Sequence, residues 1–324
     1  MIKIFSKQAD IEVNLPILAS ETYLKNKSDK YGWICSDNYI LPYFLDTKII
    51  FTRMVFTYTL IAKQKNLTVD NEFIFLNEMV DFVKNKKLCD FIYQAQSNVI
   101  FNACPTEGDC VPWGTYEANL SLSPEELLKS FHVKHRNVIK KASKNSVKIE
   151  VSTNMKLLQE VISDTMTRQK VVHFPSLKYL LKLQENIPEN LLSLVAIQEG
   201  NIQGVAVFIY DDEKAYYMYG GSSRSPYTGS MNLLHFEAMK IFQKKNIKKY
   251  DFVGARINLE KGSKYEGLDR FKNRFGTVLV QGYAFRVVVN PLKFKMFNIL
   301  GGIYLKLRGY NYIDPIDSIK RVER

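Results

Sequence analysis

The sequence is poor in the residues that build metal sites and disulfide frameworks. Its 324 residues include four cysteines, four histidines and two tryptophans. Because the cysteines form no Cys-x-x-Cys pair, we expect no zinc site and no bound metal. Cys104 and Cys110 are spaced closely enough to pair, but reduced thiols are the expected state in a reducing compartment.

Long hydrophobic runs are also missing. No uncharged stretch approaches the roughly 18 residues that a bilayer-spanning helix needs. The first residues, Met-Ile-Lys-Ile-Phe-Ser-Lys, lack the apolar core of a secretory signal. The expected location is therefore the cytoplasm, with peripheral contact at the cytoplasmic membrane as the alternative to a freely diffusing protein.

Basic residues are abundant by contrast. The chain has 45 Lys and Arg against 33 Asp and Glu, a net charge of +12. A surface this basic concentrates polyanions such as tRNA, nucleotide-sugar diphosphates or anionic lipid. The charge does not choose among these partners, and a charge excess that only confers solubility is the alternative.

Hydrophobic patterning places strands and helices in the first half of the chain. Short aromatic and β-branched runs predict strands, and apolar residues at helical spacing predict one helix. The strands are residues 39–45, 48–58, 89–94 and 99–101, and the helix is residues 70–86. This mixture indicates an α/β or α+β domain.

A basic helix is predicted over residues 124–144. Ser123 is its expected N-cap, and Glu126 completes a capping box. The strictly alternating residues 147–151 then begin a new strand. We therefore place a domain boundary near residue 145, with the basic helix as the connection.

The second half alternates strands and helices in a recognisable order. Two amphipathic helices precede an antiparallel meander of three strands, which is followed by a helix, a strand and a basic-aromatic segment. These elements are residues 155–171, 177–185, 192–198, 202–210, 215–219, 230–245, 249–253 and 267–276.

This order resembles the Fem-type peptidyltransferases, the FemABX family, which belong to the Gcn5-like N-acyltransferase (GNAT) superfamily. The resemblance rests on four segments of the second half and on a Lys-x-Arg-x-x-Ile-x-x-Ala pattern at 134–142. The four are Tyr-Tyr-Met-Tyr-Gly-Gly-Ser-Ser at 216–223, Asn-Leu-Leu-His-Phe-Glu-Ala at 232–238, Tyr-Asp-Phe-Val-Gly at 250–254 and Gly-Leu-Asp-Arg-Phe-Lys-Asn-Arg-Phe-Gly at 267–276.

The resemblance implies an α+β fold of two tandem GNAT-like domains, each a mixed, largely antiparallel sheet flanked by helices. We expect residues 1–145 to form a diverged N-terminal domain and residues 146–290 to form the catalytic domain. Residues 291–324 form a basic amphipathic tail. The tail is expected to pack against the body, and contact with a membrane surface is the alternative.

Acyl transfer to an amine needs positive or hydrogen-bonding groups where the oxyanion develops. No Ser-His-Asp or Cys-His spacing indicates a covalent intermediate, so direct attack is expected. Lys272 occupies the position of the family's Phe-Lys lysine, and the resemblance implies that Lys272 and Phe271 are catalytic. The alternative is a basic surface turn that Phe271 and Phe275 anchor in the core.

Further residues are candidates for substrate binding. Tyr216 and Tyr219 lie three apart on one predicted strand, so they are expected on opposite faces. The resemblance implies that one aromatic residue of this strand lines the substrate channel, and core packing of both tyrosines is the alternative. Ser222 and Arg224 belong to a turn before a helix, where free backbone N–H groups can bind phosphate. Arg270 adds a cation beside Lys272.

Lys27 is the candidate for holding the pyrophosphate of a peptidoglycan precursor. It follows Ala-Ser-Glu-Thr-Tyr-Leu-Lys-Asn and precedes Gly-Trp, an arrangement similar to one that the family carries near its N-terminus. No general base is assigned, because Asp251, Glu237 and His235 each have a structural explanation as strand-end, surface and packing residues.

The function implied is transfer of an aminoacyl group from aminoacyl-tRNA to an amine of a nucleotide-linked or lipid-linked cell-envelope precursor in peptidoglycan biosynthesis. No tightly bound cofactor is expected. The alternative is an acyl-CoA-dependent N-acyltransferase that acts on an amino sugar in surface polysaccharide biosynthesis. A third possibility is an inert module that binds RNA or envelope components.

Overall fold

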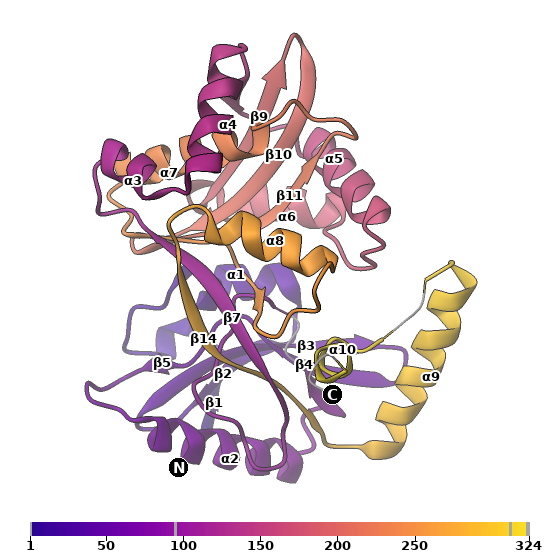
Figure 1. The fold of residues 1–324 in the computed structure, drawn as a ribbon. Helices are drawn as coiled ribbons and strands as arrows, with labels where there is room; N and C mark the ends of the chain where they lie inside the picture. Colours follow the sequence, from indigo (N-terminus) through magenta and orange to yellow (C-terminus); the bar gives the residue numbers. More distant parts are fainter. Residues whose placement is uncertain (1, 94–95, 311–312, 322–324) are drawn as a thin grey trace. The chain divides into compact units, whose positions relative to one another are not determined.

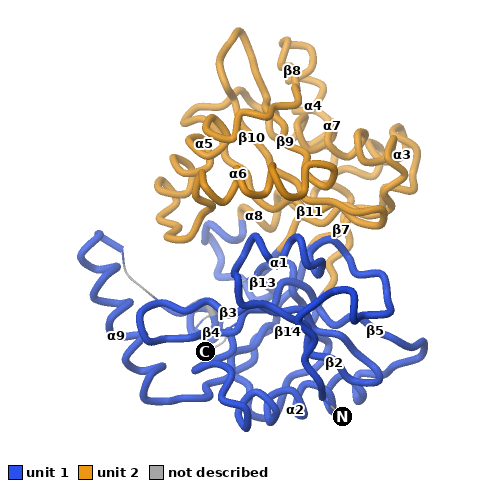
Figure 2. Tube along the Cα trace, turned by 180° about the vertical axis from the view of Figure 1, so that it is seen from behind, with its two compact units in different colours: residues 1–115, 254–266, 281–324 blue, residues 116–253, 267–280 orange. Residues whose placement is uncertain are grey.

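The chain divides into two compact units. The computed structural model describes residues 2–93, 96–310 and 313–321. Unit 1 comprises residues 1–115, 254–266 and 281–324, and unit 2 comprises residues 116–253 and 267–280 (Figure 2). This interleaved division differs from the sequential boundaries expected near residues 145 and 290. Three elements continue from one unit into the other, namely β7 (Asp109–Asn119), α8 (Lys264–Asn273) and β14 (Val278–Val288).

Unit 1 is built on a mixed sheet with the strand order β1-β2-β3-β4-β6-β14, in which β4 and β6 are parallel. The strands are β1 (Lys3–Phe5), β2 (Tyr31–Cys35), β3 (Tyr39–Lys48), β4 (Phe51–Phe56), β5 (Ile61–Ala62), β6 (Phe91–Tyr93) and β13 (Ala255–Arg256). The helices are η1 (Gln8–Asp10), η2 (Ile17–Ala19), α1 (Glu21–Lys27), α2 (Val69–Asn85), α9 (Pro291–Leu307) and α10 (Pro315–Lys320) (Figure 1).

Alternation along the strands gives the sheet of unit 1 two apolar faces. Ile34 and Leu41 lie in the cluster that contains the apolar side of α2. Their neighbours Trp33 and Ile40 lie instead in a second cluster with Leu24 of α1. Because successive side chains of a strand point to opposite faces, α2 and α1 cover opposite sides of this sheet.

Three predicted strands of unit 1 differ in extent from the structure. Residues 48–58 are not one strand, because β3 continues to Lys48 and a turn at Ile49, with a φ of 60°, leads into β4. Residues 99–101 form no strand and contribute one bridge, between Phe101 and Tyr283. The strand expected over 89–94 is β6, and Gln94 lies outside the described residues.

Cys104 and Cys110 form a disulfide, so the expected reduced thiols are not what the structure shows. Between them the Gly108 N–H donates to the Pro105 carbonyl at 2.9 Å. This turn brings the two Cα atoms to 6.3 Å, a distance that a disulfide spans.

Unit 2 has the strand order β7-β12-β11-β10-β9-β8, in which β11 and β12 are parallel. The remaining strands are β8 (Lys148–Val151), β9 (Leu191–Gln198), β10 (Asn201–Tyr210), β11 (Lys214–Ser222) and β12 (Lys249–Asp251). The helices are α3 (Pro124–Ser130), α4 (Val133–Lys144), α5 (Met155–Arg168), α6 (Leu177–Asn186), η3 (Pro188–Asn190) and α7 (Ser230–Lys244). The predicted meander and the helix that follows it are confirmed as β9–β11 and α7.

The two units share one plan. In each, a single helix connects a pair of parallel strands within an otherwise antiparallel sheet, α2 before β6 and α7 before β12. The predicted α+β fold class, with mixed and largely antiparallel strands flanked by helices, is confirmed, although the strands of the two units belong to one continuous sheet order.

The predicted helix over residues 124–144 is two helices, because the chain is extended at Phe131 and His132. Phe131 is 1% exposed, and its ring packs edge-on against Phe275 with centroids 5.1 Å apart. The His132 N–H donates to the Arg274 carbonyl at 2.9 Å. Burial of an aromatic ring contributes more than the helical hydrogen bonds lost at a single break.

Gly229 precedes α7 with a φ of 91°, and a Cβ there would collide with the Val138 carbonyl of α4. Gly200 in the β9–β10 turn has a φ of 76° and open space around it. We expect Gly200→Ala to cost about 1–2 kcal/mol of unfolding free energy through backbone strain alone. Gly229→Ala should cost about 2 kcal/mol more, because strain and collision add.

Chemical denaturation of the full chain measures this difference. Equal costs for the two variants would show that α4 does not pack against the start of α7 as described.

Candidate active site

The run at 267–276 lies mostly within the helix α8, and this helix is tied to unit 2 at two places. Asp269 accepts a hydrogen bond from the Tyr116 hydroxyl of β7 at 2.6 Å. Phe271 and Phe275 enter an aromatic cluster in which both rings lie 5.5 Å from the ring of His235. A helix places residues three and four apart on neighbouring positions, so these anchors fix the direction of Lys272.

The Lys272 ammonium lies at the end of β12. Its Nζ donates to the Val253 carbonyl at 2.6 Å. Val253 has a φ of 41°, a left-handed conformation that is strained for a β-branched residue. The Val253 N–H donates to Asp251 Oδ1 at 2.8 Å. Two side chains therefore hold a strained peptide at this point of the chain.

The parallel strands β11 and β12 separate at the same point. Their register begins at Lys214 opposite Lys249 and ends at Tyr216 opposite Asp251, whereas β11 continues to Ser222. In the described residues no strand pairs with the β12 side of β11 beyond Tyr216. Lys272 and Val253 thus lie where a sheet of unit 2 opens.

Burial lowers the pKa of Lys272 to about 8, against the opposing effect of the Asp251 and Asp269 carboxylates. The apolar part of these surroundings is Phe271, Phe275 and Phe252, which contact one another. An ammonium in a site of low polarity acts more strongly on a nearby anion than one in water. The arrangement can therefore stabilise a developing oxyanion.

Two buried histidines belong to the same aromatic cluster. His235 is fully buried, its Nδ1 lies 2.6 Å from the Tyr250 hydroxyl, and burial lowers its pKa to about 3. Burial likewise lowers the pKa of His135 to about 4. A general base works best with a pKa near the working pH, so both imidazoles are better explained as packing groups.

Tyr216 and Tyr219 lie on the same face of β11, not on opposite faces as predicted. Tyr216 pairs with Ile209 and Tyr219 pairs with Val207, and the bulged residue Met218 between them has no partner in this register. Val207 and Ile209 are two apart on β10 and therefore share a face of the sheet. Their partners Tyr219 and Tyr216 lie on that same face. Tyr216 is 2% exposed and belongs to the core.

Tyr219 packs against Tyr179 of α6, with ring centroids 6.2 Å apart. Tyr217 faces the other side of the sheet, where its ring lies 4.5 Å from His235. A Cβ at Gly220 would collide with the Tyr217 hydroxyl. Tyr217, rather than Tyr216, is therefore the tyrosine of this strand that shares the aromatic surroundings of α8.

The turn between β11 and α7 offers few free N–H groups to a phosphate. The Ser222 N–H donates to Thr165 Oγ1 at 2.9 Å and the Tyr227 N–H to Gln203 Oε1 at 2.7 Å. The Ser223 N–H donates to the Gln203 carbonyl at 3.1 Å. Arg224 is exposed and forms an ion pair with Asp164. These bonds disfavour the expected phosphate site at Ser222 and Arg224.

The remaining candidates have surroundings of other kinds. Arg270 is exposed on α8, and Glu237 is paired with Lys240 on α7 at 2.7 Å. Lys27 ends α1 in unit 1, its Nζ lies 5.1 Å from the centre of the Tyr23 ring, and burial lowers its pKa to about 7.

Sequence reasoning missed Tyr116, Asp269 and Tyr217. The three-residue spacing of Asp269 and Lys272 would have placed both on one side of a helix, had residues 264–273 been predicted as helical.

Within residues 2–93, 96–310 and 313–321, no three His, Cys, Asp or Glu side chains gather where they could hold a metal ion.

Several solved structures share this fold at low sequence identity. The structure of FemX superposes with a TM-score of 0.61 and 14% identity, over 87% of this chain and 94% of that one. The C-terminal domain (DUF2156) of a protein provisionally named lysylphosphatidylglycerol synthetase, from Agrobacterium fabrum, has a TM-score of 0.55 and 13% identity, over 90% of this chain and 95% of that one. L-PGS from Bacillus licheniformis has a TM-score of 0.52 and 15% identity, over 85% of this chain and 90% of that one.

At the level of sequence, no protein of curated function matches the chain. Residues 197–301 match the FemAB family, and this stretch contains β11, α7, β12 and α8 with Lys272. The predicted resemblance to the Fem-type family is confirmed, because residues 197–301 carry the FemAB match and the fold is similar to that of FemX.

Proposed function

We propose that the protein transfers an aminoacyl group from aminoacyl-tRNA to an amine of a cell-envelope precursor in the cytoplasm, as a Fem-type enzyme of peptidoglycan biosynthesis. The observation that carries the proposal is the position of Lys272. It lies within the FemAB match, its ammonium is partly buried, and it is held at the point where β11 and β12 separate.

The chemistry assigned to Lys272 is stabilisation of an oxyanion. A neutral amine of the acceptor attacks the ester carbonyl of the donor, and the carbonyl oxygen becomes negatively charged in the tetrahedral intermediate. The C–O bond to the tRNA ribose then breaks, and the ribose oxygen leaves with a proton from the attacking amine. An ammonium already fixed by Val253 needs little reorganisation to stabilise this charge.

The acyl-CoA alternative has less support in the chain. A CoA pyrophosphate would need free N–H groups at the turn between β11 and α7, and those of Ser222, Ser223 and Tyr227 already have acceptors in the protein. Val138 of α4 also closes on the backbone at Gly229, where α7 begins.

We also propose that α9 rests on a membrane surface that contains anionic lipid. The helix is held to unit 1 along one side, where Phe294 and Phe297 contact Phe91 and Lys293 pairs with Asp90. Its other side exposes a stripe of large apolar residues at helical spacing. The stripe is Leu292, Met296, Ile299, Leu300, Ile303, Tyr304 and Leu307.

Charge favours a lipid surface over a second protein as the partner of α9, the yellow helix at the outside of unit 1 in Figure 1. Residues 291–310 contain no Asp or Glu, and Lys295, Lys306 and Arg308 are exposed. Each cation near an anionic leaflet contributes about 1 kcal/mol, so the three supply roughly 3 kcal/mol beside the apolar stripe. Among the described residues no helix has the length and apolar composition to cross a bilayer.

Lys272→Met tests the catalytic assignment. Because removal of an oxyanion donor costs about 100-fold to 1,000-fold in kcat, we expect a loss of that size in aminoacyl transfer from charged tRNA to a muropeptide precursor. Lys240→Met removes a partly exposed lysine of α7 and should change the rate by less than about 2-fold.

Lys272→Met and Lys240→Met each remove one positive charge, so a difference in rate between them reports the position of the charge and not the net charge. A rate that falls equally in both, or in neither, contradicts the role of Lys272. Precursor or tRNA binding without turnover in the unchanged protein would instead indicate an inert binding module.

The activity of the unchanged enzyme should fall as pH rises above about 8. Oxyanion stabilisation needs the ammonium, and Lys272 loses its proton above a pKa of about 8. Arg stays protonated throughout, so Lys272→Arg should be slower yet lose this alkaline decline. Initial rates of kcat/KM between pH 6.5 and 9.5, corrected for spontaneous ester hydrolysis, measure it. A decline that persists in the Arg variant assigns the titration to another group.

The membrane assignment predicts sedimentation with vesicles that contain phosphatidylglycerol and little binding to pure phosphatidylcholine. Ile303→Asp with Leu307→Asp should reduce vesicle binding at least 10-fold, because both side chains are exposed on the α9 stripe. The control is Val151→Asp with Leu181→Asp, which adds the same charge at exposed apolar positions of unit 2. Unchanged binding of the α9 variant contradicts the proposal.

A further inference from the structure

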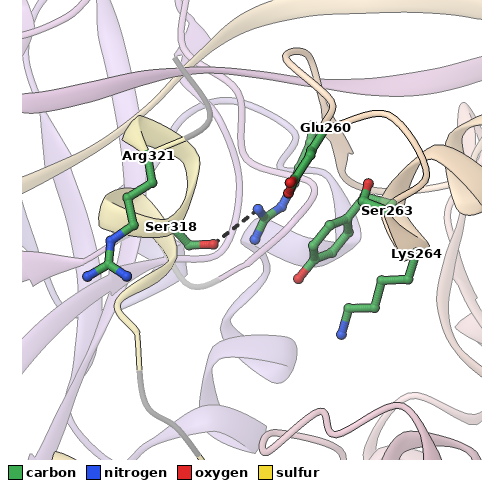
Figure 3. A pocket seen from close by; sticks show the side chains of 7 residues that line it. Glu260, Ser263, Lys264, Ser318 and Arg321 are labelled. Carbon is green, nitrogen blue, oxygen red and sulfur yellow. Dashed lines mark hydrogen bonds between the residues drawn. The ribbon is translucent and has the colours of Figure 1, made fainter. Parts of the chain in front are cut away.

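A cationic pocket lies in unit 1, formed by the loop that follows β13, the start of α8 and the end of α10 (Figure 3). Its volume is about 490 Å³. The lining residues are Arg256, Glu260, Ser263, Lys264, Tyr265, Ser318 and Arg321. Three cations face one carboxylate, so the lining has an excess of positive charge.

Arg256 is the residue that its surroundings fix in place. Its guanidinium stacks on the Tyr265 ring, 3.8 Å from the ring centroid, and its Nη1 donates to Ser318 Oγ at 3.2 Å. A guanidinium held by stacking is oriented before a ligand arrives, and its planar donors match the geometry of phosphate oxygens.

Arg256 differs from Arg286 in its partners. Arg256 is partly buried and Arg286 is buried, and both contact α10. Arg286 forms ion pairs with three carboxylates, those of Asp109, Asp314 and Asp317. Burial lowers the pKa of Arg256, and in the described part of the chain no carboxylate forms an ion pair with it. A partly desolvated cation without a counter-ion is costly, and an anionic ligand would offset that cost.

Hydroxyl groups complete a donor set suited to an oxyanion. Ser263 directly precedes α8 and Ser318 lies in α10, and both hydroxyl groups line the pocket. The side chains of Lys264 and Arg321 also line it (Figure 3). A volume of about 490 Å³ is within the range of small-molecule sites and exceeds what one inorganic ion requires.

We propose that this pocket binds the phosphate or diphosphate group of the phosphorylated acceptor substrate. The inference rests on the proposed function for the choice of substrate, and on the donor set of unit 1 for the choice of chemical group. Lys27, the candidate suggested by the family resemblance, is a residue of α1 and does not line this pocket.

Inorganic pyrophosphate is the probe, used with the full chain at low ionic strength and followed by calorimetric titration. We expect Arg256→Gln and Arg321→Gln each to weaken pyrophosphate binding about 10-fold. Lys261→Gln, which removes an exposed cation of the same loop that does not line the pocket, should change the dissociation constant less than 2-fold. Equal weakening by all three variants would show attraction by net charge alone and overturn the proposal.

Two further measurements separate this proposal from the proposed function. In the transfer assay, Arg256→Gln should raise KM for the phosphorylated acceptor at least 10-fold and leave kcat within about 2-fold. Lys272→Met should leave pyrophosphate affinity unchanged. If transfer is intact and pyrophosphate does not bind, the pocket assignment fails alone. If pyrophosphate binds as expected and no transfer occurs, the proposed function fails alone.

Discussion

The candidate site depends on one strained peptide. Val253 adopts a left-handed conformation directly after β12, and it is held there because Asp251 accepts from its N–H and Lys272 donates to its carbonyl. The left-handed turn ends the parallel pairing with β11 and so produces the opening of the sheet. The same bond that satisfies the turn also fixes the ammonium. Backbone strain and placement of the charged group are therefore one structural feature.

The aromatic cluster around α8 explains why this charge is perturbed. Phe131, between α3 and α4, packs against Phe275 of unit 2, and Phe275 in turn contacts Phe252 beside the strained peptide. Burial of Phe131 at one end of the cluster thus separates α3 from α4. At the other end the aromatic rings shield Lys272 from water and so lower its pKa. The Asp251 and Asp269 carboxylates stabilise the Lys272 ammonium, which still donates to the Val253 carbonyl.

Much of the fold could be predicted from local patterns. The capping box at Ser123, the meander of unit 2 and the helix α7 follow from capping residues, alternation and helical spacing, which act over a few residues. The break at Phe131, the bulge at Met218 and the return of β14 to unit 1 could not, because they depend on partners far away in the chain. Family resemblance supplied Lys272, but the bond from Lys272 to Val253 and the bond from Tyr116 to Asp269 depend on the tertiary structure.

The path of the chain has a consequence for the order in which the protein can fold during synthesis. Phe285 and Val287 of β14 lie in the same core as α2, and β14 supplies the antiparallel partner of β6. Residues 3–93, which hold the other main strands of this sheet, therefore leave the ribosome well before their partner strand β14 is translated. Unit 2 lies mostly between them in the sequence and can organise its own sheet earlier, so the strands of unit 1 stay exposed to chaperones until β14 emerges.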